Sequence, residues 1–330
     1  MSDEYREFSA LMKRSAFTQA AAFAERQLVA VGDKSEFWLT QLSNALRESG
    51  NAKGALAAAD KASTLSPRNA WALLARAEAL VKLGRLGEAL PLFEEALVDA
   101  RAAQRARWGR LSALTLLKQW DRVITECASP NLSAAARPFR VKALHGLGRL
   151  DEAIVECESW LSEDGDSRQA LWQMTELRIA RDGLDEVLAN MGRLAKIPGK
   201  PAVYGEIYAS LCKRAGNSAK AADQYARLSR GNSSPDLLRK QAFALAKSGR
   251  ESEALPIMEE LLRLDPKDMY LHAAYTPACK RKGSLDRAHG FYAKLIILHP
   301  EEKSLYGRIK RLDREIAEAA RDTDPQGGLS

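Results

Sequence analysis

The phrase "LGRLGEAL" at residues 83–90 returns as "LGRLDEAI" at residues 147–154. Related phrases stand at 48–56, 214–222, 247–255 and 281–289, each with a glycine about five residues before a small side chain. The small residues follow one another at intervals of 33 or 34 residues, with one interval of 30. They are Ala55, Ala89, Val123, Ala153, Val187, Ala221, Ala254 and Ala288. A sustained period of this length is typical of a repeat protein.

Within each period, apolar residues recur at three- and four-residue intervals, which predicts helices. A glycine between two helices permits the positive φ with which a chain often leaves the first of them. One helix pair cannot bury its apolar face alone, so neighbouring pairs must stack. The sequence therefore predicts an all-α solenoid of about nine helix-turn-helix repeats with a C-terminal capping helix.

The repeat at 36–69, "EFWLTQLSNALRESGNAKGALAAADKASTLSPRN", resembles the tetratricopeptide repeat family. It has small residues at Ser43, Ala55 and Ala62, where that family's pattern has them, and it has the corner glycine and the late proline. The resemblance implies a superhelix over residues 36–302. It also leads us to expect a degenerate repeat or cap at 1–35, a capping helix at 303–320 and a disordered tail at 321–330.

The pattern is irregular between residues 100 and 200. The repeat that begins at 104 is four residues short, which explains why the opening phrases stand 64 rather than 68 residues apart. In the repeat that begins at 168, Arg178 falls where a leucine is expected. A register shifted by one residue would make Leu177 the packing residue, and the sequence leaves this choice open.

The positive charge of the chain, +7 in total, is concentrated in residues 101–150, which we call the basic belt. Ten basic and two acidic side chains give the basic belt a net charge of +8. Two pairs within it, Arg107 with Arg110 and Arg137 with Arg140, have the i,i+3 spacing that places both side chains on one helical face. The four guanidiniums either form ion pairs with acids of the second helices, such as Glu94, Glu126 or Glu156, or stay unpaired and bind an acidic partner.

The resemblance further implies a concave groove lined by fixed positions of each first helix. Carried over to this sequence and joined to the four arginines, these positions give a set of candidate partner-binding residues. They are Trp71, Arg105, Arg107, Trp108, Arg110, Arg137, Arg140, Lys142, His145, Trp172, Lys213, Arg214, Arg239 and Lys247. Aromatic side chains beside cations often anchor protein interfaces. The alternative is that Trp71 and Trp172 pack between repeats and that the lysines form a solvated face.

Motifs for catalysis or metal binding are missing from the sequence. It has no GxxxxGK[ST], no GxGxxG after a strand-like run, no CxxC and no HExxH. The four cysteines fall at packing positions, where we expect them to be buried as small apolar residues. We therefore expect a protein that is not an enzyme and has neither cofactor nor metal.

No apolar run is long enough to cross a membrane and the start is unlike a secretory signal, so we expect a cytoplasmic protein. The composition suggests a bacterial source.

These observations favour a non-catalytic scaffold or adaptor. Its concave groove would hold a peptide or helix of another protein, acidic at its centre. The alternative is an RNA-binding helical repeat protein that uses the basic belt. The oligomeric state, the identity of the partner and the choice between the concave and convex face stay open.

Overall fold

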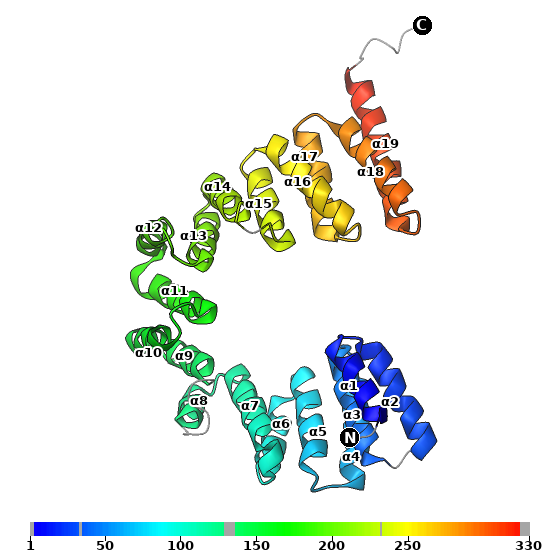
Figure 1. The fold of residues 1–330 in the computed structure, drawn as a ribbon, viewed down its shortest axis with the longest axis vertical. Coiled ribbons are helices and arrows are strands. Elements are labelled where there is room, and N and C mark those ends of the chain that lie inside the picture. Colours follow the sequence, from blue (N-terminus) through cyan, green and yellow to red (C-terminus); the bar gives the residue numbers. More distant parts are fainter. Residues whose placement is uncertain (1–2, 33–34, 129–135, 232, 324–330) are drawn as a thin grey trace. The chain divides into compact units, whose positions relative to one another are not determined.

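The computed structural model describes residues 3–32, 35–128, 136–231 and 233–323 (Figure 1). Within these ranges all regular secondary structure is helical, which confirms the predicted all-α class. The chain divides into two compact units, unit 1 (Met1–Leu177) and unit 2 (Arg178–Ser330).

Unit 1 contains α1 (Asp3–Lys13), α2 (Phe17–Val31), α3 (Glu36–Glu48), α4 (Ala52–Leu65), α5 (Ala70–Lys82), α6 (Leu86–Ala96), α7 (Ala100–Leu116), α8 (Trp120–Cys127), α9 (Arg137–Gly146), α10 (Leu150–Glu163) and most of α11 (Arg168–Asp182). Unit 2 contains α12 (Leu184–Leu194), α13 (Ala202–Arg214), α14 (Ser218–Ser229), α15 (Pro235–Lys247), α16 (Glu251–Leu264), α17 (Met269–Arg281), α18 (Leu285–Leu298) and α19 (Lys303–Thr323).

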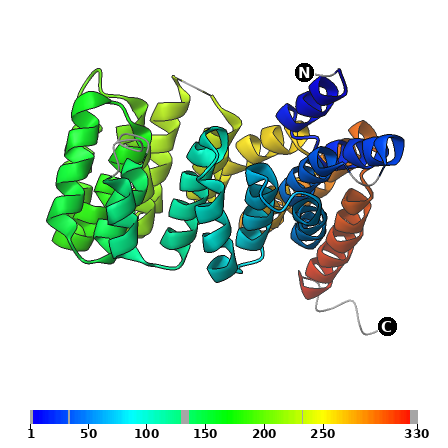
Figure 2. The same ribbon diagram turned by 90° about the horizontal axis from the view of Figure 1, so that it is seen from below.

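Each sequence period corresponds to one helix pair. In unit 1, α3 packs against α4, α4 against α5, and α3 also against α5, so a first helix contacts both its own second helix and the next first helix. Figures 1 and 2 show the pairs of unit 1 following one another in chain order. Serial stacking of helix pairs is the solenoid arrangement that the period predicts.

The recurring small residues lie in the first turn of every second helix from α4 to α18. All eight are buried, with at most 5% of the surface of each exposed. A small side chain at this point lets the two helices of a pair approach closely without a steric clash. The residues that reveal the period in the sequence are therefore the ones that set the helix spacing.

The corners between paired helices have the predicted left-handed geometry. Gly84 and Gly148, in the two opening phrases, have φ of 75° and 74°. In the shortened repeat the same place is taken by Lys118, with φ of 56°. A side chain is disfavoured in this region of φ, so the shortened repeat keeps the corner conformation without its usual residue.

The irregular middle is explained only in part. Helix α8 has eight residues, and residues 129–135, which follow it, lie outside the described ranges. In α11, Leu177 is 1% exposed and belongs to an apolar cluster with Val141 and Ile154, whereas Arg178 is half-buried. The shifted register, with Leu177 as the packing residue, is therefore the correct one.

Both ends of the repeat region are helical. Residues 3–31 form α1 and α2, in which Ala20 and Ala24 are fully buried. Helix α19 packs Leu305 and Leu312 into the core of unit 2 and continues to Thr323, beyond the predicted end of the capping helix at 320. The remainder of the predicted tail, 324–330, lies outside the described residues. All four cysteines are buried, as expected.

Candidate functional site

The first helices of unit 1 form a surface, the first-helix face, that carries two pockets. The first, the aromatic cavity, has a volume of about 330 Å³. It is lined by Tyr5, Glu36, Phe37, Thr40, Gln41, Asn44, Asn69, Trp71 and Arg105. The second, the lysine–tryptophan pocket, has a volume of about 260 Å³. It is lined by Val141, Lys142, His145, Trp172, Gln173, Glu176 and Leu177.

The aromatic cavity is built by the repeat itself. Phe37, Trp71 and Arg105 are spaced by 34 residues, so they occupy the same place in three successive repeats. Stacking of the repeats brings these equivalent positions side by side on α3, α5 and α7. Phe37 is 45% and Trp71 37% exposed. Trp71 is therefore partly exposed at the cavity and is not fully buried in the core.

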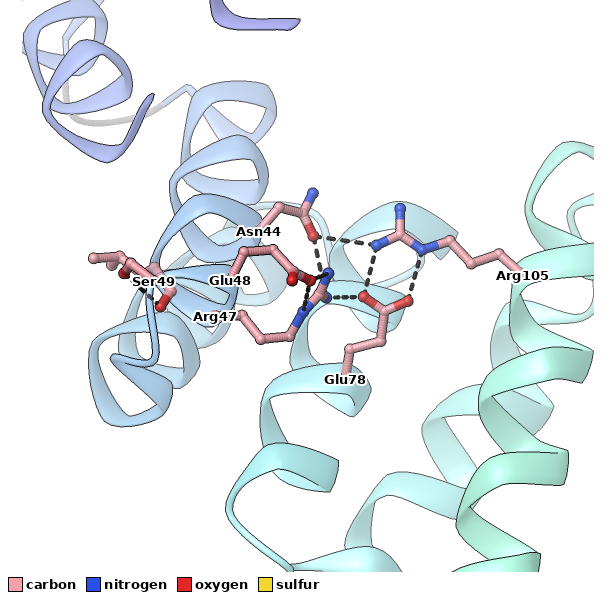
Figure 3. Close-up of polar contacts among 7 residues, drawn as sticks. Asn44, Arg47, Glu48, Ser49, Glu78 and Arg105 are labelled. Atoms are coloured by element: carbon pink, nitrogen blue, oxygen red, sulfur yellow. Dashed lines mark hydrogen bonds and ion pairs between the residues drawn. The ribbon is translucent and has the colours of Figure 1, made fainter. Parts of the chain in front are cut away.

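An ion-pair network joins two residues of the cavity lining, Asn44 and Arg105, to Arg47 and Glu78 (Figure 3). The carboxylate of Glu78 accepts hydrogen bonds from Arg105 Nε and Nη2, both at 2.6 Å, and also from Arg47. Asn44 Oδ1 accepts from Arg105 Nη2 at 3.3 Å and from Arg47 Nη1 at 3.4 Å. Burial lowers the pKa of both arginines, which nevertheless remain charged near neutral pH. The network joins α3, α5 and α7, and it neutralises the cation predicted to face a partner.

The carboxylate that lines the cavity itself has no such neutralising partner. Glu36, in the first turn of α3, accepts hydrogen bonds from Thr40 Oγ1 at 3.2 Å and from Asn69 Nδ2 at 2.9 Å. Both donors are uncharged. Among the described residues no cation forms an ion pair with Glu36. The N-terminus of α3 stabilises its negative charge.

The lysine–tryptophan pocket brings together three predicted groove residues. Lys142 and His145 are exposed on α9, and Trp172 is half-buried on α11. Gln173 Nε2 donates to the carbonyl of Pro138 at 3.4 Å, while its buried Oε1 has no partner within the described part of the chain. The pocket therefore presents a cation, an indole and the carboxylate of Glu176, which also lines it.

Of the four arginines that form the two i,i+3 pairs of the basic belt, three are in ion pairs and one is not. Arg110 forms ion pairs with Glu126 and, at 3.8 Å, with Glu94. Arg137 Nη2 lies 2.5 Å from Glu163, and Arg140 Nε lies 3.4 Å from Glu156. The interpretation that all four guanidiniums are unpaired is wrong for these three. Arg107 forms no ion pair with any described carboxylate.

Most of the remaining charge of the basic belt is also neutralised. Arg101, Arg105, Arg122 and Arg149 pair with Asp99, Glu78, Glu94 and Glu152. Nearly all of the neutralising acids lie outside residues 101–150, so a charge sum over that window misses them. Within the described ranges, the basic side chains of the belt that form no ion pair are Arg107, Lys118 and Lys142.

The other candidates are not brought to these two pockets. Trp108 packs its ring against Phe139 at 5.7 Å between centroids. Arg239, Lys213, Arg214 and Lys247 belong to unit 2. Arg239 pairs with Asp268 at 2.7 Å, and the other three are exposed.

Sequence reasoning missed Tyr5, Glu36, Asn69 and Glu78. Glu78 occupies the same position of its repeat as Asn44 and Lys142, so the family's groove positions contain a signal for it. Tyr5 comes from α1, outside the regular repeats, and packs edge-to-face on Phe37 at 5.6 Å. No repeat position predicts it.

The described residues contain no group of three or more His, Cys, Asp or Glu side chains arranged to hold a metal ion. Within the same ranges, no helix combines the length and the apolarity that crossing a bilayer requires.

The family model described as tetratricopeptide repeat matches residues 46–114, which span α4 to α6 and the flanking parts of α3 and α7. Residues 46–114 therefore form tetratricopeptide repeats. Tetratricopeptide repeats are in general a protein–protein interaction fold, since stacked repeats present extended binding surfaces.

A comparison with solved structures matches this chain to two tetratricopeptide repeat structures. The crystal structure of a tetratricopeptide repeat protein from Parabacteroides merdae is 15% identical, with a TM-score of 0.51 over 74% of this chain and 100% of that one. The TPR domain of P58(IPK) is 15% identical, with a TM-score of 0.30 over 96% of this chain and 98% of that one. No curated protein matches the sequence. The likeness to the Parabacteroides merdae structure supports the fold alone.

Proposed function

We propose that this tetratricopeptide-repeat protein is a non-catalytic scaffold that holds a segment of a partner protein along the first-helix face of unit 1. The observation that carries the proposal is the convergence of predicted groove residues on two pockets. Trp71 and Arg105 line the aromatic cavity, and Lys142, His145 and Trp172 line the lysine–tryptophan pocket. Five different first helices, α3 to α11, contribute to the two pockets together.

The type of occupant follows from pocket size and exposure. Each pocket is at or below the lower end of the range typical of small-molecule sites, which suits single side chains of a bound chain. Partly exposed indoles such as Trp71 and Trp172 can bury a large area with little loss of side-chain entropy. A peptide or helix with side chains in both pockets satisfies these conditions.

We further propose that the centre of this segment is acidic. Lys142 is exposed in the lysine–tryptophan pocket, and neither it nor Arg107 has a described carboxylate as partner. A carboxylate of the segment would form a charge-assisted hydrogen bond with Lys142 beside the indole of Trp172. The paired state of Arg110, Arg137 and Arg140 confines this preference to a small area.

The alternative of RNA binding has less support. Affinity for a phosphate backbone scales with the number of cations free to contact it. Ion pairs engage seven of the ten basic side chains of the belt. The proposed location is the cytoplasm, where the four buried thiols would stay reduced.

A paired-variant affinity experiment tests the proposal. Proteins that co-purify with the full chain are identified, and each is then produced and titrated against purified chain. The variant Lys142→Glu/Trp172→Ala should weaken binding of the true partner at least tenfold, which corresponds to about 1.4 kcal/mol. The control, Lys61→Glu/Val155→Ala, makes the same change of charge and also truncates an apolar side chain to alanine, on the exposed sides of α4 and α10. Equal affinity of the two variants would contradict the proposed face.

A further inference from the structure

The aromatic cavity has a local charge opposite to that of the basic belt. Its one cation, Arg105, is neutralised by Glu78, and Arg47 pairs with both Glu78 and Glu48. The formal charges of these four side chains sum to zero. Glu36 then remains as an anion held only by uncharged donors.

The walls around Glu36 are aromatic. Tyr5, Phe37 and Trp71 all line the cavity. Tyr5 and Phe37 meet edge-to-face, whereas the ring of Trp71 makes no contact with another described aromatic ring. No described cation lies over the ring of Phe37 or Trp71, although Arg26, Lys200 and Arg263 cover Phe23, Tyr204 and Phe291 elsewhere in the chain.

Aromatic faces and a carboxylate attract the same kind of group. The face of an aromatic ring carries partial negative charge and binds ammonium and guanidinium ions, most strongly at Trp. A carboxylate adjacent to such rings adds a charge-assisted hydrogen bond. The amide oxygen of Gln41 can accept a remaining N–H donor, whereas Asn44 Oδ1 already accepts from Arg47 and Arg105.

We infer that the aromatic cavity binds a basic side chain, lysine or arginine, with its aliphatic stem against Trp71 and Phe37 and its charged end at Glu36. This inference rests on the proposed function and extends it, since it specifies a residue of the bound segment. The segment would present a basic residue to the aromatic cavity and acidic residues to the lysine–tryptophan pocket. Such opposite charges fix the direction and register in which the segment binds.

The size of the cavity agrees with this occupant. A volume of about 330 Å³ admits one long side chain but not a folded element. Lysine and arginine are the side chains that combine an apolar stem with a charged end. An acidic side chain would instead meet Glu36, and like charges at close range repel.

Nuclear magnetic resonance of the full chain tests the inference. The probes are Nα-acetyl-lysine methylamide, its norleucine counterpart, which keeps the stem without the charge, and its glutamate counterpart. The readout is the indole N–H signal of Trp71, identified as the signal lost in Trp71→Phe. The lysine probe should shift this signal in a saturable way, with an affinity at least fivefold above that of either other probe.

Two variants separate the charge from the aromatic wall. Glu36→Gln should reduce the affinity for the lysine probe at least fivefold and leave that for the norleucine probe unchanged. Glu95→Gln, an equal change of charge at an exposed residue of α6, should change neither. Equal affinity for lysine and norleucine, preference for glutamate, or indifference to Glu36→Gln would overturn the inference. Because the lysine–tryptophan pocket is not probed here, these outcomes leave the proposed function to its own experiment.

Discussion

Arg105 and Glu78 form a two-pronged ion pair between α7 and α5, with Nε and Nη2 of the arginine each 2.6 Å from a carboxylate oxygen. Arg47, from α3, binds the same carboxylate. One glutamate therefore links three successive repeats. The contact fixes the position of Arg105, which lines the aromatic cavity, and removes it as a free cation.

Replacing Glu78 with Gln should destabilise unit 1. The variant leaves Arg105 without a carboxylate partner and leaves Arg47 with Glu48 alone. We expect the free energy of unfolding to fall by about 1–3 kcal/mol, less than for a fully buried pair because these groups are partly exposed. Urea denaturation followed by circular dichroism measures the change.

The matched control is Glu88→Gln. Glu88 pairs with Arg85 in an i,i+3 contact in which both side chains are about half exposed. The denaturation midpoint of this variant should stay at the wild-type value. A loss of equal size in both variants would mean that the shared carboxylate has no special role.

Gly109→Ala should destabilise the chain because the new Cβ would lie 2.2 Å from Cε1 of Phe93. Phe93 is fully buried and cannot move aside. We expect the free energy of unfolding to fall by about 1–3 kcal/mol. Gly87→Ala is the control, because its Cβ would meet nothing within 4 Å in α6. That variant should gain about 0.5–1 kcal/mol from helix propensity, and a loss there would contradict the packing described for α6 and α7.

Lys118→Gly should stabilise the shortened repeat. Lys118 holds a φ of 56°, which glycine adopts without strain. We expect a gain of roughly 0.5 kcal/mol, since relief of strain slightly exceeds the added freedom of the unfolded chain. The reciprocal change, Gly84→Ala at a φ of 75°, should lower the free energy of unfolding by about 1 kcal/mol. Thermal melting of both variants tests the pair, and a loss in Lys118→Gly would refute the strained corner.

Unit 2 should lose stability in mild acid through His272. This ring is 1% exposed, with Nε2 2.9 Å from the carbonyl of Pro266 and Nδ1 3.1 Å from the hydroxyl of Tyr292. Because a carbonyl only accepts, Nε2 carries the proton, and Nδ1 accepts from Tyr292. Burial lowers the pKa of His272, so the folded state disfavours the second proton.

The direction of the pH effect follows from that shift. The unfolded chain protonates His272 near its ordinary pKa of about 6.5, whereas the folded chain does so only at lower pH. The stabilising contribution is therefore complete above about pH 6.5 and declines as the pH falls below it. Urea midpoints between pH 5 and 8 should show this decline in the wild type. His272→Gln should flatten it, while His289→Asn, which alters a ring that is 40% exposed, should retain it.

The sequence predicts the repeat architecture because its determinants are local. Ala89 and Gly84 act within one helix pair, so their spacing alone reveals the helix contact and the corner. The first-helix positions of Trp71 and Lys142 follow from the same period. The ion pairs do not follow from the period, because Glu78 pairs with Arg105, which lies 27 residues away and in another repeat.

The predicted site was incomplete for a related reason. Tyr5 enters the aromatic cavity from α1, which precedes the regular repeats. The charge of Glu36 becomes significant only when Arg105 is known to be neutralised. Both facts depend on side-chain contacts between helices, which the period does not encode.

Site-specific photocrosslinking in native cells tests most directly whether the first-helix face of unit 1 binds a partner protein. A photoreactive phenylalanine analogue replaces Trp172 in one version of the full chain and Val155, 62% exposed on α10, in another. We predict that one partner protein crosslinks at position 172, and that the yield falls when Lys142→Glu is added. A partner that crosslinks at position 155 and not at 172 would contradict the assignment of the binding face.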